Sequence, residues 1–526
     1  MAVSATLLGT FTVGYLIVIS LLAYLGYRKT KCADDYMVCG RNIHPIILAL
    51  SYGATFISTS AIVGFGGLAG QLGMGLIWLT VLNIGVGILL AFAVFGKRTR
   101  ALGKKLGAMT FPDLMGKAYG SGFIRKAGAM IVVVGMPLYA SAILIGGARF
   151  IESTFGVTYN TALLAFAVVV AIYVVVGGLI AVMYTDALQG SIMAIGMSIL
   201  LVLTYVKLGG IREAHAALSS MSDLMPEGLA AAGLTGWTSM PSLGSPIWYT
   251  LITTIVLGVG IGVIAQPQLV VRFMTVRNDR SLHRAIAVGG PFIMIMTGVA
   301  FTVGALTNVY YLRETGSIAL TAAGGNVDSI IPNYINAAMP DAFIVIFMLA
   351  LLSAAMSTLS SLFHTMGTAL GHDLWGAKKN VTSTHKSTQA ATIVMIVATI
   401  GLAYLMPANI IARATAMFMG LCASALLPAF ALALYNKSPS ALAAKTSIVT
   451  GAAVWFAWTA FIHVKESAAL GISSFLFGKD ALLAMPWQVV DPLVIALPLS
   501  TLALVTMKLW ESRASLGSAE QEVEPF

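Results

Sequence analysis

The stretch SYGATFISTS, residues 51–60, lies in an apolar segment that is long enough to cross a membrane. More than half of it consists of hydroxyl-bearing residues and glycine, at Ser51, Gly53, Thr55, Ser58, Thr59 and Ser60. A helix that faces lipid gains nothing from such a polar run, whereas irregular backbone within a membrane is tolerated where it lines a cavity. The stretch therefore predicts a membrane helix that opens near its middle.

The composition predicts an all-α polytopic membrane protein around this stretch. Of the 526 residues, 58% are hydrophobic and 10% are charged, against about 25% charged residues in soluble domains. Apolar runs of about 20 residues recur along the chain without alternating with polar residues, which excludes a membrane β-barrel. Cys32, Cys39 and Cys422 form no metal-binding or disulfide pattern.

We predict thirteen membrane-spanning helices, the first of them a retained span and not a signal peptide. The spans cover residues 5–27, 45–69, 74–96, 127–153, 158–178, 179–207, 248–275, 287–312, 341–370, 389–407, 409–435, 441–463 and 489–509. They divide the chain into a first helix and loop (1–44), helices 2–6 (45–207), an extracellular loop (208–247), helices 7–11 (248–435), helices 12 and 13 (436–510) and a cytoplasmic tail (511–526).

Basic residues predict the orientation in the cell membrane. They concentrate in the loops after odd-numbered spans, as in GKRTRALGKK (96–105) after the third. Because cytoplasmic loops carry the excess of lysine and arginine, we expect the N-terminus outside and the C-terminus in the cytoplasm. The net charge of +10 is then largely topological, and no nucleic-acid partner is inferred.

The seventh span carries a second polar interruption, GVGIGVIAQPQ (258–268). Its glycines and proline weaken the helical hydrogen-bond ladder, as the opening stretch does in the second span. Either could be an ordinary kinked packing helix. Interrupted helices at matching positions of two repeats, however, are typical of secondary transporters. Spans 2 and 7 lie five apart, which favours two inverted five-helix repeats.

The ninth span presents a row of hydroxyls in LLSAAMSTLSSLF (351–363). Ala354, Ser357, Thr358 and Ser361 share one helical face, and Ser353 and Ser360 lie nearby. Such hydroxyls can bond to a carbonyl one turn back. Beside an opened helix they also form a set of neutral oxygen ligands, which suits Na⁺ better than a divalent ion that would need more carboxylates.

Two charged residues stand out within predicted spans. Asp186, in YTDALQG (184–190), is the main acid at membrane depth, where a charge is costly and normally functional. A surface residue that reaches the interface is the alternative, and proton coupling through Asp186 is a rival to sodium coupling. We expect Arg272 at the cytoplasmic end of span 7, paired with an acid or a lipid phosphate, and not as a substrate ligand.

Six stretches, in order, resemble the sodium/solute symporter family over nearly the full chain, with its sodium/proline, pantothenate and monocarboxylate members. They are DDYMVCGRNI (34–43), SYGATFIS (51–58), GGARFIESTFGVTY (146–159), GGLIAVMYTDALQG (177–190), AQPQLVVRFMTVRND (265–279) and LLSAAMSTLSS (351–361). The resemblance implies a leucine-transporter-like core of spans 2–6 and 7–11, and a sodium-coupled symporter that works by alternating access.

The resemblance also implies ligands for sodium. The principal site falls on the carbonyls of Ala54 and Ile57 and on Ala354, Ser357 and Thr358. A second site, present in some members, falls on Asp186, Ser360 and Ser361, with Ser357 able to share. One hydroxyl of that second site is replaced here by Ala61.

The substrate prediction is a small carboxylate, of monocarboxylate or pantothenate type. The sodium/proline branch shares AQPQLVVRFM and matches at Tyr139 on helix 4. Its aromatic positions on helices 2 and 7, however, hold Ser60, Val259 and Val263 here, and its acid is replaced by Phe56. Proline or another amino acid is the alternative. The candidate outer gate is Gln71 with Trp78. For each of these residues, and for each substrate residue, a role in packing or in bonding to its own helix is the alternative. The candidate substrate residues are Thr55, Ser58, Thr59, Ser60, Tyr139, Ser141 and Gln266.

Other classes of protein are less consistent with the sequence. An intramembrane enzyme would need a catalytic pair at depth, and His364, His372 and Asp373 approach the cytoplasmic end of span 9 without a metal-ligand motif. A channel would show a pore-lining repeat or a ring of charges. We expect no enzymatic activity and no obligatory protein partner, only a small solute, Na⁺ and the bilayer.

Overall fold

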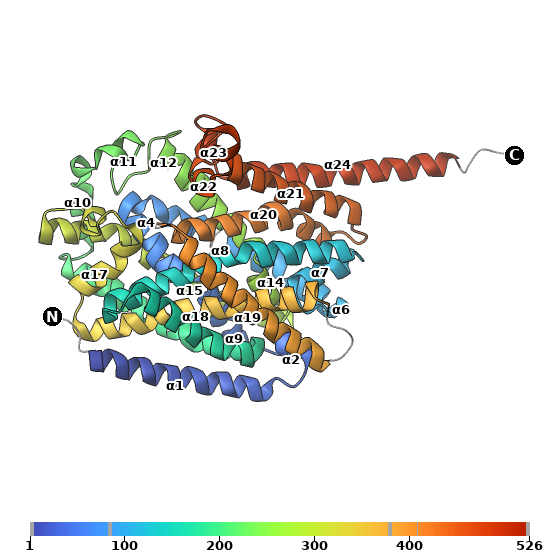
Figure 1. The fold of residues 1–526 in the computed structure, drawn as a ribbon, viewed down its shortest axis with the longest axis horizontal. Helices are drawn as coiled ribbons and strands as arrows, with labels where there is room; N and C mark the ends of the chain where they lie inside the picture. The colour runs from blue at the N-terminus through green and yellow to red at the C-terminus, as the bar shows by residue number, and fades with distance from the viewer. Residues whose placement is uncertain (1–4, 83–86, 377–380, 408, 522–526) are drawn as a thin grey trace.

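The computed structural model describes residues 5–82, 87–376, 381–407 and 409–521. Within these ranges the chain forms helices joined by turns and loops, without a strand (Figure 1). The long helices are α1 (Ala5–Lys29), α8 (Gly122–Phe155), α9 (Tyr159–Lys207), α15 (Asp279–Thr315), α18 (Asp341–Thr368), α19 (Val381–Leu405), α20 (Ile411–Tyr435), α21 (Ala441–Phe461) and α24 (Pro492–Gln521).

Shorter helices complete the fold. Those near the functional site are α3 (Pro45–Phe56), α4 (Phe65–Leu72), α5 (Ile77–Leu82), α13 (Gly260–Gly262) and α14 (Pro267–Phe273). The remainder are α2 (Ala33–Val38), α6 (Lys97–Leu106), α7 (Phe111–Ala118), α10 (Ile211–Ser219), α11 (Glu227–Ala231), α12 (Pro246–Tyr249), α16 (Ala319–Ala322), α17 (Ile330–Ala338), α22 (Val464–Leu470) and α23 (Ile472–Phe477).

The described residues contain 11 helices that are long and apolar enough to cross a membrane, and two shorter apolar helices, Pro45–Phe56 and Tyr159–Val175. The all-α membrane class is therefore confirmed. The count of thirteen stays a prediction, because residues 83–86 of the third predicted span lie outside the described residues.

Both predicted interruptions are present. Helix α3 ends at Phe56, Ile57 is extended (φ −83°, ψ 96°), and the chain resumes as a π-helical segment, Ser60–Gly64, that leads into α4. In the seventh span, Gln266 is extended (φ −72°, ψ 116°) and α14 begins at Pro267. A residue that precedes proline is pushed out of the helical region, which explains the second break.

The fifth and sixth predicted spans are joined into α9, which is bent at Gly178 (φ 62°, ψ −173°). A side chain at this position would collide with the ring of Tyr36. Only glycine adopts this backbone conformation readily. The boundary predicted at residues 178 and 179 is thus a bend within one element and not a loop.

Helix α18 lies at the centre of the bundle, in contact with α3, α8, α9 and α19 (Figure 1). Its apolar window is 83% buried, against 22% for α1 and for α24. Helix α1 runs along one edge beside α9, and α24 packs on α21 and extends beyond the other helices (Figure 1). The hydroxyl row of α18 therefore faces protein on all sides.

Helices α4 and α15 approach closely at Gly66 and Gly304. A Cβ at Gly304 would overlap the carbonyl oxygen of Gly66, whereas one at Gly298 on the same helix would meet nothing within 4 Å. We expect Gly304→Ala to destabilise the protein by about 1–3 kcal/mol, because the helices must separate. Gly298→Ala should be neutral or slightly stabilising. Thermal unfolding in detergent checks this, and equal midpoints for the two variants would contradict it.

Asp328, between α16 and α17, is buried against the N-terminus of α20 and accepts hydrogen bonds from the backbone of Asn409, Ile410 and Ile411. Burial raises the pKa of this carboxyl to about 6. Since the folded state then binds the proton more tightly than the unfolded state, the contribution of Asp328 to stability is greatest below about pH 4 and falls as pH rises through 6.

We expect Asp328→Asn to remove this part of the pH dependence, on the order of 2 kcal/mol between pH 4 and 7. Unfolding midpoints of the wild type and the variant at a series of pH values measure it. A variant whose midpoint changes with pH as steeply as that of the wild type would show that Asp328 is not the group responsible.

Candidate functional site

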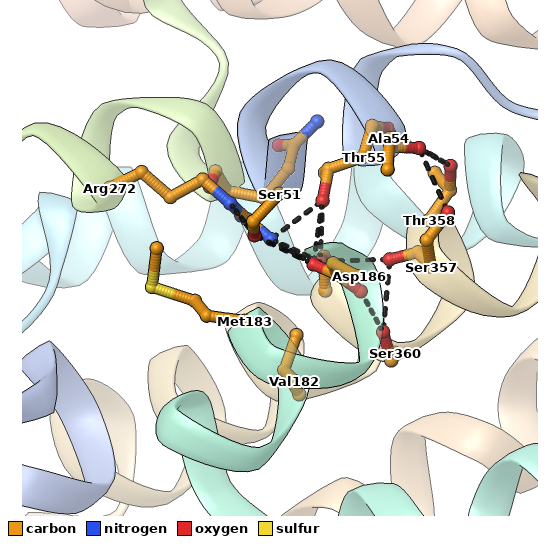
Figure 2. Close-up of polar contacts among 12 residues, drawn as sticks. Ser51, Ala54, Thr55, Val182, Met183, Asp186, Arg272, Ser357, Thr358 and Ser360 are labelled. Atoms are coloured by element: carbon orange, nitrogen blue, oxygen red, sulfur yellow. Dashed lines mark hydrogen bonds and ion pairs between the residues drawn. The ribbon is translucent and has the colours of Figure 1, made fainter. Parts of the chain in front are cut away.

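The hydroxyl row of α18 meets the broken end of α3 (Figure 2). Ser357 Oγ donates to the Ala54 carbonyl at 2.9 Å, and Thr358 Oγ1 donates to the Thr55 carbonyl at 3.0 Å and lies 3.4 Å from that of Ala54. Both hydroxyls also contact the Ala354 carbonyl, at 3.2 and 3.1 Å. The structure thus brings together four of the five residues predicted for the principal sodium site.

The break at Ile57 makes these carbonyls available. In a continuous helix, the Ala54 and Thr55 carbonyls would accept from the amides four residues later. Here Ile57 still donates to the Gly53 carbonyl at 2.8 Å, but the helix ends there, and α18 hydroxyls bond to the next two carbonyls. Ile57, the fifth predicted ligand, is buried at the break, and no hydrogen bond in the described part of the chain links its carbonyl to the group.

This donor set fits a sodium ion. It offers carbonyl and hydroxyl oxygens, all neutral, from residues that are fully buried. Oxygen ligands suit hard cations, and a set without a carboxylate favours a single positive charge over a divalent ion. The residues that would hold Na⁺ are therefore Ala54, Ala354, Ser357 and Thr358, with Ile57 beside them.

A buried ion pair lies next to this group. Arg272 Nη2, on α14, is 2.9 Å from Asp186 Oδ2, on α9, and both side chains are 0% exposed (Figure 2). Ser51 and Thr55 hydroxyls donate to the same carboxylate oxygen, at 2.9 and 3.2 Å. The predicted pairing of Arg272 with an acid is confirmed. Neither side chain reaches the surface, so the two alternatives are wrong: Arg272 does not pair with a lipid phosphate, and Asp186 is not a surface residue.

The residues predicted for a second sodium ion also lie together. Ser360 and Ser361 hydroxyls are 3.4 and 3.5 Å from Asp186 carboxylate oxygens, and both donate to the Ser357 carbonyl at 2.9 Å. The Arg272 guanidinium contacts the same cluster, with Nη2 2.5 Å from Ser361 Oγ. Whether the cluster binds an ion stays a prediction.

A small cavity, with a volume of about 20 Å³, lies on the other side of the break. Its lining is apolar except for four hydroxyls and carries no charged side chain. The lining residues are Phe56, Ser58, Ala61, Phe65, Leu79, Tyr139, Val259, Thr297, Phe301, Thr415 and Met419. The cavity and the sodium-ligand group therefore share the segment from Ala54 to Ser58.

Of the seven predicted substrate residues, Ser58 and Tyr139 line this cavity. The other predicted hydroxyls do not line the cavity. Thr55 bonds to Asp186, and Ser60 is buried outside the lining. Thr59 donates to the Ile143 carbonyl at 3.1 Å, and Ser141 donates to the Thr399 carbonyl at 2.9 Å. Gln266 bonds to the Gly262 carbonyl and to Gln268.

The predicted gate residues do not line the cavity either. Trp78 is 53% exposed on the outside of α5, and Gln71 is half-buried near the end of α4. Their proposed role as an outer gate stays a prediction.

Sequence reasoning missed the part of the lining that comes from α15 and α20. Thr297 and Thr415 lie on these helices, each as an isolated hydroxyl in an apolar stretch. Each also donates to its own helix, Thr297 to the Ile293 carbonyl and Thr415 to the Ile411 carbonyl. That pattern is the ordinary behaviour of threonine in membrane helices, so it gave no signal of a cavity.

Two solved structures share the fold. One, described as the substrate-bound outward-open state of a Na⁺-coupled sialic acid symporter with a novel Na⁺ site, has a TM-score of 0.73 and 17% identity, with 95% of each chain covered. The other, MhsT in complex with L-phenylalanine, has a TM-score of 0.51 and 14% identity, with 89% of this chain and 99% of that one covered. The fold is that of a helical membrane protein with two interrupted helices.

Residues 36–451 match the model of the sodium:solute symporter family, and the chain belongs to this family. Sodium is its coupling ion. The Haemophilus influenzae sodium/pantothenate symporter is 27% identical over 471 residues, with 88% of this chain and 93% of that protein covered. The Bacillus subtilis osmoregulated proline transporter OpuE is 26% identical over 450 residues, with 84% and 87% covered. Nearly equal identities do not distinguish between these substrates.

Proposed function

We propose that this chain is a sodium-coupled symporter that imports a small organic carboxylate, of monocarboxylate or pantothenate type, by alternating access. The observation that carries the proposal is the shared segment at the break of α3. Ala54 belongs to the group of oxygens around Ser357, and Phe56 and Ser58 line the adjacent cavity. A conformational change at the sodium ligands therefore also moves the residues of this segment that line the cavity.

The roles of the residues follow from this arrangement. Ser357 and Thr358 hold the α3 carbonyls at the break, and with Ala54, Ile57 and Ala354 they supply the ligands for Na⁺. Bound Na⁺ supplies a positive charge and links transport to the sodium gradient. The α18 hydroxyls also tie the two repeats together, because α3 belongs to the first and α18 to the second.

The uncharged, hydroxyl-bearing residues that line the small cavity support a carboxylate that is held without a salt bridge. Ser58 interacts with the Tyr139 hydroxyl, and both face the space beside the restart of the second span. The N-terminal end of a half-helix is electropositive, which favours a carboxylate beside it. Val259 and Phe56 line the cavity in place of the aromatic residue and the acid of the proline branch, which makes proline the less favoured substrate.

The proposal includes a topology. It comprises thirteen helices in the cell membrane, with spans 2–6 and 7–11 as inverted repeats, the N-terminus outside and the C-terminus in the cytoplasm. The matched breaks at Ile57 and Gln266 support the repeats. Labelling of single cysteines introduced at Ser4 and at Ser518 in whole cells tests the orientation.

The substrate is tested by uptake into proteoliposomes under an inward sodium gradient, with radiolabelled pantothenate, acetate, pyruvate, lactate and proline. We expect one carboxylate to accumulate, and Tyr139→Phe or Ser58→Ala to reduce its uptake at least several-fold. Accumulation of proline alone would overturn the carboxylate assignment and leave the sodium-ligand group unaffected.

A further inference from the structure

The guanidinium of Arg272 fills the position of a cation between α3, α9 and α18. Nη2 lies 2.9 Å from Asp186 Oδ2, 2.6 Å from Thr55 Oγ1 and 2.5 Å from Ser361 Oγ. One nitrogen is thus surrounded by a carboxylate and two hydroxyl oxygens from three different helices. This is the kind of oxygen cluster that a bound metal cation would require.

The remaining nitrogens fix the side chain in this position. Nη1 donates to the Gln268 carbonyl at 2.5 Å, one turn back on α14, and Nε donates to Ser51 Oγ at 3.2 Å. The whole side chain is 0% exposed. An arginine keeps its positive charge in proteins, so the cluster holds a cation throughout.

These contacts conflict with a second sodium ion. Such an ion would take ligands from Asp186, Ser360 and Ser361. The guanidinium already uses Asp186 Oδ2 and Ser361 Oγ, and it would lie within a few ångströms of the ion with the same sign of charge. Like charges at that distance repel strongly where water is excluded.

We propose that Arg272 is the permanent cation of this second site, so that Asp186 binds no Na⁺ and the transporter carries one Na⁺ per cycle. The inference rests on the proposed function, because it assumes that the group around Ser357 binds the one coupling ion. The residues of the second site thus form a cluster without net charge that holds the two repeats together.

This assignment limits the solute gradient that the protein can sustain. With one ion, the carboxylate and Na⁺ together carry no net charge, so a tenfold sodium gradient allows about tenfold accumulation. With two ions, a potential of about 100 mV also contributes, and accumulation could reach roughly a few thousand-fold. The number of bound ions therefore separates two physiologically different transporters.

The test is the number of ²²Na⁺ ions bound per purified full-length chain in detergent at saturation. We expect one for the wild type and none for Ser357→Ala with Thr358→Ala. Arg272→Ala should bind two, because it leaves the Asp186 cluster without its cation. Adding Asp186→Asn to that variant should return the count to one.

Two ions bound by the wild type, with one lost in Asp186→Asn, would overturn the inference. One ion bound by a folded Arg272→Ala variant would overturn it too, since the vacated ligands would then hold nothing. If Arg272→Ala does not fold, the test compares the number of ions bound by the wild type and by Asp186→Asn. We expect one ion per chain in both. Binding by the wild type that survives Ser357→Ala with Thr358→Ala would instead contradict the proposed sodium site.

Discussion

Arg272→Ala is expected to lower the free energy of unfolding by about 3–5 kcal/mol when sodium is absent. The substitution leaves the Asp186 carboxylate fully buried without the cation that lies 2.9 Å from it. It also removes the hydrogen bonds that join α14 to Thr55 and Ser361. Unfolding in mixed micelles with a denaturing detergent, in choline chloride, measures the change.

Two further variants separate the lost ion pair from a general effect of truncation. Arg280→Ala, at an exposed position near the start of α15, should change stability by less than about 0.5 kcal/mol. Arg272→Ala combined with Asp186→Asn should recover a large part of the loss, because no unpaired buried charge remains. A double variant as unstable as the sum of the two single variants would contradict the pairing.

Ser357→Ala combined with Thr358→Ala is expected to weaken sodium binding by at least about 100-fold. The pair supplies both hydroxyl oxygens of the proposed site, and a hydrogen-bond-like contact to a charged group contributes about 1.5–3 kcal/mol. The two losses together amount to about 3–6 kcal/mol, which is a factor of roughly 100 or more in affinity. The sodium concentration that gives half-maximal thermal stabilisation measures the effect.

The matched control lies on the same helix. Thr365 and Thr368 are buried hydroxyls of α18 that donate to the Ser361 and Thr365 carbonyls of their own helix. Thr365→Ala with Thr368→Ala should leave the half-maximal sodium concentration within about threefold of the wild type. An equal loss in both double variants would show that the effect comes from α18 as a whole and not from the ligands.

The membrane class and the opened helix could be predicted because their causes are local. A proline after Gln266 and a run of glycine and hydroxyls around Ile57 interrupt helices wherever they occur. The α18 hydroxyls follow a helical period that is visible in the sequence. The resemblance to the family then supplied the partners of these hydroxyls, which periodicity alone does not give.

The position of Arg272 could not be predicted because its partners are distant in sequence. Asp186 is 86 residues away, and Ser361 is 89 residues away. The sequence predicts Arg272 at the cytoplasmic end of span 7, but α14 packs against α3 and α18 and the side chain is fully buried. The cavity lining on α15 and α20 was missed for the same reason, since it depends on which helices pack together.

The most direct test of the sodium site at the break of α3 is uptake of the identified solute into proteoliposomes under exchanged gradients. We predict accumulation with an inward sodium gradient, none with an inward proton gradient alone, and loss of accumulation in Ser357→Ala with Thr358→Ala. Accumulation driven by protons without sodium, at the same rate in that double variant, would contradict the account and assign the coupling to Asp186.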